Sequence, residues 1–206
     1  MEDVDGCFHL AAISSVQTAA DSWTEASTVN VVGTINVFDV AANSADRAIP
    51  VVYASSCAVY GNHRDTAHTE SVLPQPINSY GIDKYCSELY ARFVATAKGM
   101  RSHGLRLFIV YGPRQDPSSP YSGVISIFVD RLLQGKELAI HRDGKQTRDF
   151  VHVEDVVSFF MCALERADRN SQVVNVCRGA KIQIYELAHT LADILGQRHT
   201  YKNLQK

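Results

Sequence analysis

Short apolar segments typical of buried strands alternate along this chain with longer segments of helical pattern. The strand candidates are 7–12, 51–55 and 105–110. The helix candidates include 21–44, where valine and alanine recur near the 3.6-residue period, and 79–98. Strands that alternate with helices in this way favour an α/β fold built on a mainly parallel sheet.

The elements become shorter in the second half of the chain. A loop at 113–122, which holds Pro117 and Pro120, separates the long strand–helix units from the short ones. We therefore expect two regions, 1–115 and 116–206, with the chain crossing back to the first region near 150–177.

Composition excludes several classes of protein. The formal net charge is −2 without a long basic run, so the chain does not have the electrostatic signature of a nucleic-acid-binding protein. No apolar stretch approaches the ~18 residues of a membrane span, and the acidic first residues do not resemble a signal peptide. Five scattered cysteines and eight histidines show no metal-ligand spacing. We expect reduced thiols, no metal and a cytoplasmic location.

Tyr80 and Lys84 form the strongest local motif. Residues four apart share one face of a helix, and an ammonium group close to a phenol favours the phenolate. We therefore expect a lowered pKa for Tyr80, which would suit a general base or acid. The alternative for this pair alone is a solvated helix face.

Two serines, Ser55 and Ser56, end the strand candidate at 51–55. The carboxyl edge of a parallel sheet is where ligands bind in open α/β folds. A hydroxyl at that edge can hydrogen-bond a substrate oxygen. The alternative is a strand that simply ends in a turn of small residues.

Six motifs in one order make the chain resemble the extended short-chain dehydrogenase/reductases, in the nucleotide-sugar epimerase and dehydratase group. They are 5–12 (DGCFHLAA), 30–34 (NVVGT), 55–61 (SSCAVYG), 80–84 (YGIDK), 111–114 (YGPR) and 143–155 (DGKQTRDFVHVED). The segment 117–123 is most similar to that of the UDP-glucose and UDP-N-acetylglucosamine 4-epimerases.

This resemblance implies a Rossmann-like sheet with helices on both faces, a small α/β substrate-binding subdomain, NAD as cofactor, a UDP-sugar as substrate, and a homodimer. It matches Ser56, Tyr80 and Lys84 to the catalytic residues. Cofactor contacts are expected from Leu10, Ala11, Ala12, Asn30, Ser55, Tyr80 and Lys84, and substrate contacts from Ser56, Tyr80 and Arg148. Without the family, Arg148 could instead form a surface ion pair with Asp149 or Asp155, and Asn30 could be a helix-surface amide.

The sequence also departs from the family pattern. The glycine fingerprint G-x-x-G-x-x-G is absent, so we expect the chain to lack the family's first strands and to bind NAD weakly or not at all. The sequence also stops near Lys206, ahead of the family's C-terminal substrate-binding segment, so we expect a chain truncated at both ends. Ile109 stands where the family carries a phosphate-contacting asparagine. Two other interpretations stay open: a catalytically silent fragment or interaction module, and a dehydratase or reductase. Dehydration is disfavoured because Cys57 and Ala58 replace that group's acid–base pair.

Overall fold

The computed structural model describes residues 4–44, 47–62, 67–197 and 201–204. The chain divides into two compact units. The first comprises 1–108 and 156–176, and the second comprises 109–155 and 177–206. The division thus falls at Phe108, ahead of the boundary expected at 115, because the strand that follows Phe108 pairs within the second unit.

The first unit is built on a four-stranded sheet in the order β1-β2-β3-β8. Its strands are β1 (Cys7–His9), β2 (Val51–Ser56), β3 (Ser102–Leu107) and β8 (Gln172–Val176), and every neighbouring pair is parallel. The predicted α/β fold with a mainly parallel sheet is therefore confirmed.

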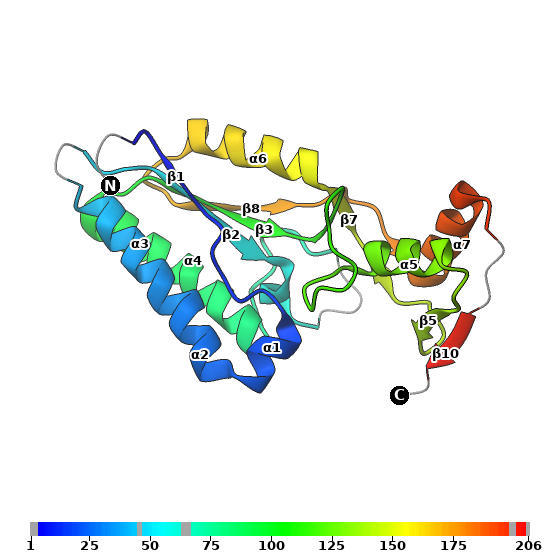
Figure 1. Cartoon of the computed structure of the whole chain (residues 1–206). Helices are drawn as coiled ribbons and strands as arrows, with labels where there is room; N and C mark the ends of the chain where they lie inside the picture. The colour runs from blue at the N-terminus through cyan, green and yellow to red at the C-terminus, as the bar shows by residue number, and fades with distance from the viewer. Residues whose placement is uncertain (1–3, 45–46, 63–66, 198–200, 205–206) are drawn as a thin grey trace. The chain divides into compact units, whose positions relative to one another are not determined.

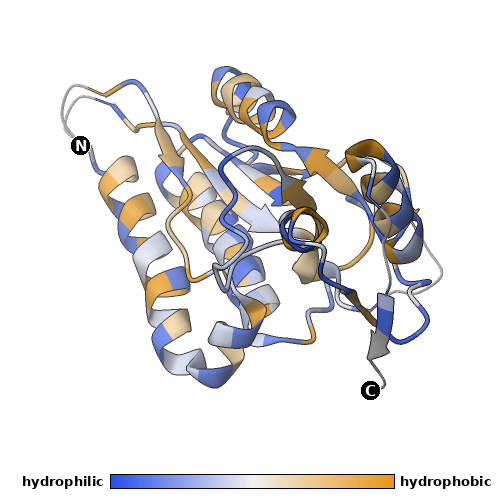
Figure 2. Ribbon diagram, turned by 45° about the vertical axis from the view of Figure 1, so that its right-hand side comes forward, coloured by the Kyte–Doolittle hydropathy of each residue, from blue (hydrophilic) through white to orange (hydrophobic). Residues whose placement is uncertain are grey.

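Helices cover both faces of this sheet (Figure 1). On one face lie α3 (Gly33–Ala42) and α4 (Ser79–Lys98), and on the other lies α6 (Val153–Arg166). The core beneath α3 and α4 is closely packed, and it holds the buried side chains of Phe38, Ala41, Ile49, Val51, Tyr53, Ala91, Val94 and Met100. Hydrophobic and hydrophilic residues alternate along the helices, as expected for helices that cover a sheet (Figure 2).

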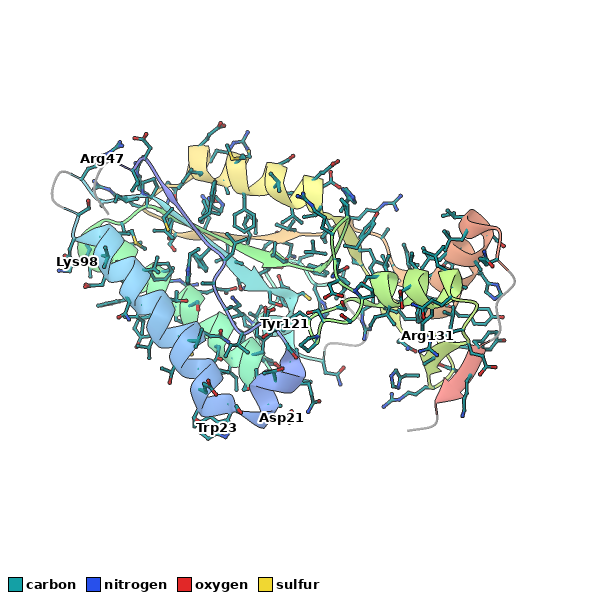
Figure 3. The ribbon with its side chains drawn as sticks, in the orientation of Figure 1. Asp21, Trp23, Arg47, Lys98, Tyr121 and Arg131 are labelled. Carbon is teal, nitrogen blue, oxygen red and sulfur yellow. The ribbon has the colours of Figure 1, made fainter. Side chains whose placement is uncertain are left out.

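The helix expected at 21–44 is interrupted. After α1 (Val16–Asp21), the chain forms α2 (Trp23–Ser27), a π-helical turn (Thr28–Val32) and then α3. The single tryptophan, Trp23, projects from the start of α2 and is 61% exposed (Figure 3). A π-turn inserts one extra residue into a helix, and such turns are frequent at functional sites.

The helix α4 spans Ser79–Lys98, as predicted. The Asn78 side chain caps the helix by accepting from the Gly81 N–H at 2.8 Å. The Ser79 hydroxyl instead donates to the carbonyl of Ala19 at 2.8 Å, which ties α1 to the start of α4.

In the residues that the structure describes, the second unit contains three pairs of short strands and two helices. Its strands are β4 (Ile109–Tyr111), β5 (Leu138–His141), β6 (Thr147–Arg148), β7 (Phe150–His152), β9 (Ile182–Gln183) and β10 (Tyr201–Leu204). The pairs β4–β7 and β5–β10 are parallel, and β6–β9 is antiparallel. Its helices, α5 (Val124–Leu133) and α7 (Ile184–Leu195), enclose an apolar core around Phe128, Leu138 and Phe150. No helix in the described ranges is long and apolar enough to cross a membrane.

Candidate active site

Three side chains meet where β2 ends and α4 begins. Ser56 is the last residue of β2 and is 9% exposed, while Tyr80 and Lys84 lie in the first turns of α4. The Ser56 hydroxyl lies close enough to the Tyr80 phenol to lower its pKa. The Lys84 ammonium lies 5.7 Å from the centroid of the Tyr80 ring. The sheet edge that is expected to bind ligands therefore carries a hydroxyl, a phenol and an amine together.

Backbone contacts fix the position of this cluster. The Lys84 ammonium donates to the Ala54 carbonyl on β2 at 2.8 Å. The Ser56 hydroxyl oxygen accepts from the Ala58 N–H at 3.2 Å, at the start of a 3₁₀ turn (Cys57–Tyr60). A Cβ at Gly81 would lie 2.6 Å from the Ala58 carbonyl oxygen. Glycine is therefore what allows α4 to approach this turn closely.

The electrostatics of the cluster correct one expectation. Burial raises the pKa of Tyr80, and the neighbouring Ser56 hydroxyl only partly opposes this rise. The predicted lowering by Lys84 was wrong, because the ammonium is bonded to a backbone carbonyl and lies over the ring. Burial lowers the pKa of Lys84 from 10.5 to about 8, although the charge of Asp83 opposes this lowering.

The pKa of Lys84 predicts a pH-dependent stability. Between pH 8 and 10.5 the unfolded chain binds more protons than the folded chain, so the free energy of unfolding should rise with pH. Below pH 8 the cost of burying the charge is fully present. Urea titrations at pH 8, 9 and 10 should show the wild type gaining stability over Lys84→Met by up to about 1.4 kcal/mol per pH unit. Parallel pH curves for the two proteins would contradict this expectation.

The expected cofactor-binding residues lie near the cluster, but not all of them are accessible. Leu10 and Ala11, at the carboxyl end of β1, are exposed, and Ala12 is half-buried. Asn30 lies in the π-turn and is 2% exposed. The Ser55 hydroxyl is buried and donates to the Glu88 carboxylate at 2.5 Å. The side chains of Asn30 and Ser55 are thus engaged within the protein.

A buried polar network behind the cluster was not predicted from the sequence. Arg106 on β3 binds both oxygens of Glu88 on α4, at 2.9 and 2.7 Å. It also donates to the Tyr60 hydroxyl at 2.9 Å, which in turn donates to the Asn175 side chain on β8 at 2.6 Å. The sequence feature that could have indicated this network is Arg106, a charged residue within an otherwise apolar strand segment.

Arg148 lies in the second unit, on the wall of a pocket of about 260 Å³. Its guanidinium donates to the Thr147 carbonyl at 2.8 Å. Asp149, one of its expected alternative partners, instead accepts from the backbone N–H groups of Arg178 and Ala180, at 2.7 and 2.9 Å. Ile109 lines the same pocket and presents only an apolar side chain there.

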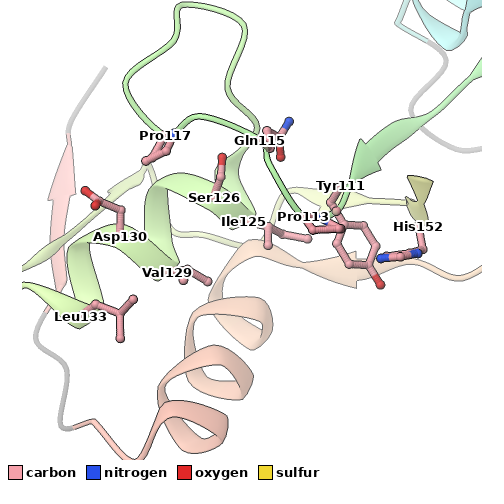
Figure 4. Close-up of a pocket in the computed structure, with 11 residues that line it drawn as sticks. Tyr111, Pro113, Gln115, Pro117, Ile125, Ser126, Val129, Asp130, Leu133 and His152 are labelled. Atoms are coloured by element: carbon pink, nitrogen blue, oxygen red, sulfur yellow. The ribbon is translucent and has the colours of Figure 1, made fainter. Parts of the chain in front are cut away.

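A second pocket of about 470 Å³ lies along the other side of α5 (Figure 4). Tyr111, Ile125, Val129 and His152 are among its lining residues. None of the site residues expected from the sequence lines it. In the described part of the chain, no cluster of three histidine, cysteine, aspartate or glutamate side chains could hold a metal ion.

The parallel sheet and the serine, tyrosine and lysine at its carboxyl edge define a Rossmann-like protein of the short-chain dehydrogenase/reductase class. The chain belongs to the NAD-dependent epimerase/dehydratase family, whose model matches residues 1–177. A putative UDP-glucose 4-epimerase of Methanocaldococcus jannaschii is 34% identical over 199 residues, which are 96% of this chain and 63% of that protein.

Solved structures give the same result. A UDP-N-acetylglucosamine 4-epimerase from Methanobrevibacter ruminantium, in complex with UDP-N-acetylmuramic acid, superposes with a TM-score of 0.93 at 32% identity, over 99% of this chain and 64% of that one. The UDP-glucose 4-epimerase of Thermus thermophilus, in complex with NAD, has a TM-score of 0.88 at 26% identity, over 98% and 65%. The chain therefore spans somewhat less than two thirds of the proteins that it matches.

Proposed function

We propose that this chain carries the catalytic centre of a NAD-dependent nucleotide-sugar 4-epimerase that acts on a UDP-sugar. The observation that carries the proposal is the meeting of Ser56, Tyr80 and Lys84 at the carboxyl edge of the sheet. The family match and the likeness to UDP-sugar epimerases support the choice of reaction and substrate.

Each member of the cluster has a distinct proposed task. The Ser56 hydroxyl holds the sugar hydroxyl at C4, and Tyr80 takes the proton from that hydroxyl and later returns it. Burial raises the pKa of Tyr80, so its phenolate needs a nearby cation. Lys84, whose ammonium lies 5.7 Å from the ring centroid, is the cation proposed to favour the phenolate once cofactor and substrate occupy the site. Cys57 and Ala58, which follow Ser56, carry no carboxyl group, so the cluster lacks an acid–base pair for removing water.

NAD, when bound, supplies the hydride chemistry that no amino-acid side chain can perform. The described residues fit this cofactor in part. Segment 10–12 is open to a ligand at the carboxyl end of β1, and Tyr80 and Lys84 offer hydrogen-bonding groups for a ribose. Asn30 and Ser55 are buried, and their side chains bond within the protein. Their proposed role is therefore to support the cofactor surface and not to contact the cofactor with their side chains.

The pocket lined by Arg148 is the proposed site for the diphosphate of the UDP-sugar. A guanidinium fork pairs with phosphate oxygens bidentately, and Arg148 has no ion-pair partner among the described residues. Ile109 on the same wall offers no hydrogen bond to a phosphate. Phosphate recognition here therefore depends more strongly on Arg148.

A chimera provides the test of this function. This chain would be joined to the parts of the Methanocaldococcus jannaschii relative that it does not cover, and incubated with NAD and UDP-glucose. The proposal expects the C4 epimer, UDP-galactose, in the proton NMR spectrum. A dehydrated 4-keto product would show a dehydratase instead, and a folded chimera that leaves the sugar unchanged would favour a catalytically silent chain.

The proposed assembly is a homodimer formed through α3 and α4, which lie side by side (Figure 1). Val40 on α3 and Leu89, Tyr90 and Phe93 on α4 are 46%, 42%, 39% and 63% exposed. An apolar patch of this kind marks an interface, and a two-fold axis would pair it with its own copy. Phe38 on α3 and Val94 on α4 do not belong to this patch, because both side chains lie in the core.

Phe93→Glu is expected to convert the dimer to a monomer, because it places a charge in the apolar contact. Light scattering of the wild type and the variant measures the change. Phe159→Glu, at a 40% exposed position on α6, is the matched control and should leave the dimer intact. A wild-type protein that is monomeric at micromolar concentration would rule out this assembly.

The proposed location is the cytoplasm. All five cysteines are free, and free thiols are typical of a reducing compartment.

A further inference from the structure

Asp83 is a buried acid on α4, between Tyr80 and Lys84 in the sequence. Its side chain is almost fully enclosed, with 2% of the residue exposed. Its two carboxylate oxygens accept from neutral donors, the Ser27 hydroxyl at 2.7 Å and the Asn30 amide nitrogen at 3.1 Å. A buried carboxylate is costly unless such donors are kept in place, so these contacts constrain the groups that make them.

Asn30 links Asp83 to the segment that follows β1. Its side-chain oxygen accepts from the Ile13 N–H at 2.8 Å, and its amide nitrogen donates to the Ile13 carbonyl at 3.2 Å. A carboxylate can only accept hydrogen bonds. Asp83 therefore requires Asn30 to turn its NH₂ group inwards, and this orientation leaves the Asn30 oxygen facing the Ile13 N–H.

The other end of the same segment is held by the same helix. The Thr34 hydroxyl donates to the Asn30 carbonyl at 2.6 Å and lies 2.8 Å from the His9 Nε2. His9 and Ile13 flank segment 10–12. The π-turn and the first turn of α3 therefore contact the chain on both sides of this segment. Only the contact at Ile13 depends on the orientation of an amide, and the Asp83 carboxylate and the Ile13 backbone groups together fix that orientation.

We propose that Asp83 is a positioning residue that, through the Asn30 amide, holds segment 10–13 in register with Tyr80 and Lys84 on α4. The importance of this register for catalysis rests on the proposed function, whereas the hydrogen-bond chain does not. Replacement by asparagine removes the constraint with almost no change of shape, since an asparagine at position 83 can present either its oxygen or its NH₂ group to Asn30.

Amide hydrogen exchange followed by NMR on the chain itself tests the proposal. In Asp83→Asn the Ile13 amide should exchange at least about tenfold faster, while core amides such as that of Tyr53 stay within about twofold of the wild type. The matched control is Asp39→Asn, an exposed aspartate on α3, which should change neither. Unchanged Ile13 exchange in a folded Asp83→Asn protein would overturn the proposal.

A second readout separates positioning from general loosening. The charge of Asp83 raises the pKa of Lys84, so an NMR titration of the Lys84 side chain should give a value below about 8 in Asp83→Asn. If this variant does not fold, Asn30→Ala takes its place and should release the Ile13 amide by the same factor. Protection of Ile13 retained in Asn30→Ala would equally overturn the proposal. Neither measurement uses cofactor or substrate, so an inactive chimera would reject the proposed function and leave this inference standing.

Discussion

Replacing Tyr80 by phenylalanine in the chimera is expected to lower the rate of UDP-sugar epimerisation by about 10²–10⁴-fold, the usual cost of losing a general base. The described residues place this phenol beside the Ser56 hydroxyl. The substitution keeps the ring and its contact with Lys84, so the effect should fall on turnover with little change in KM. Initial rates measured by coupled assay give both constants.

The matched control for this variant is Tyr90→Phe. Tyr90 lies on the same helix but faces outwards, with 39% of the residue exposed. It should keep the wild-type rate. If Tyr80→Phe retained activity within about threefold of the wild type, where a loss of two orders of magnitude or more is expected, the assignment of Tyr80 as the base would have to be abandoned.

Replacing Arg106 by methionine is expected to destabilise the fold by about 3–5 kcal/mol, the usual cost of leaving one partner of a buried ion pair alone. The side chains of Arg106 and Glu88 are 6% and 2% exposed. Without the guanidinium, the Glu88 carboxylate keeps the hydrogen bond from the Ser55 hydroxyl but loses its ion-pair partner, and the Tyr60 hydroxyl loses the hydrogen bond that Arg106 donates to it. Urea denaturation followed by circular dichroism measures the loss.

Two further variants identify the cause of this loss. The double variant Arg106→Met, Glu88→Met removes both charges and should recover most of the lost stability, because no unpaired charge remains buried. Arg47→Met breaks the exposed pair with Asp5 and should change stability little. A double variant as unstable as Arg106→Met alone would mean that packing, and not the charge of Glu88, causes the effect.

The long elements could be predicted because hydrophobic periodicity alone specifies them. The bounds of α4 agree with those expected, and the strand expected at 51–55 extends one residue further, to Ser56. The strand expected at 105–110 is instead divided between two strands, because β3 ends at Leu107 and Ile109 pairs with Phe150 in the second unit. Such a change of partner depends on residues far along the chain, which a local pattern does not contain.

The sequence predicted which residues form the site more completely than it predicted their chemistry. The spacing of Tyr80 and Lys84 correctly predicted that they share a helix face. Whether the pKa of Tyr80 is raised or lowered depends on burial, which the spacing does not show. The π-turn around Asn30 could not be read from the sequence, since the valines around it also fit an uninterrupted helix. Asp83 gave no signal of its own, because one acidic residue in a helix is normally solvated.

Deuterium at C4 of the substrate provides the most direct test of the central claim, that Ser56, Tyr80 and Lys84 serve a hydride transfer at that carbon. UDP-glucose deuterated at C4 would be converted by the chimera in ordinary water, with NAD present, and the UDP-galactose analysed by NMR and mass spectrometry. We predict that the product keeps its deuterium at C4, because the hydride that leaves the carbon returns to its other face. Loss of the label to solvent would contradict the account, since it would mean that C4 exchanges a proton and not a hydride.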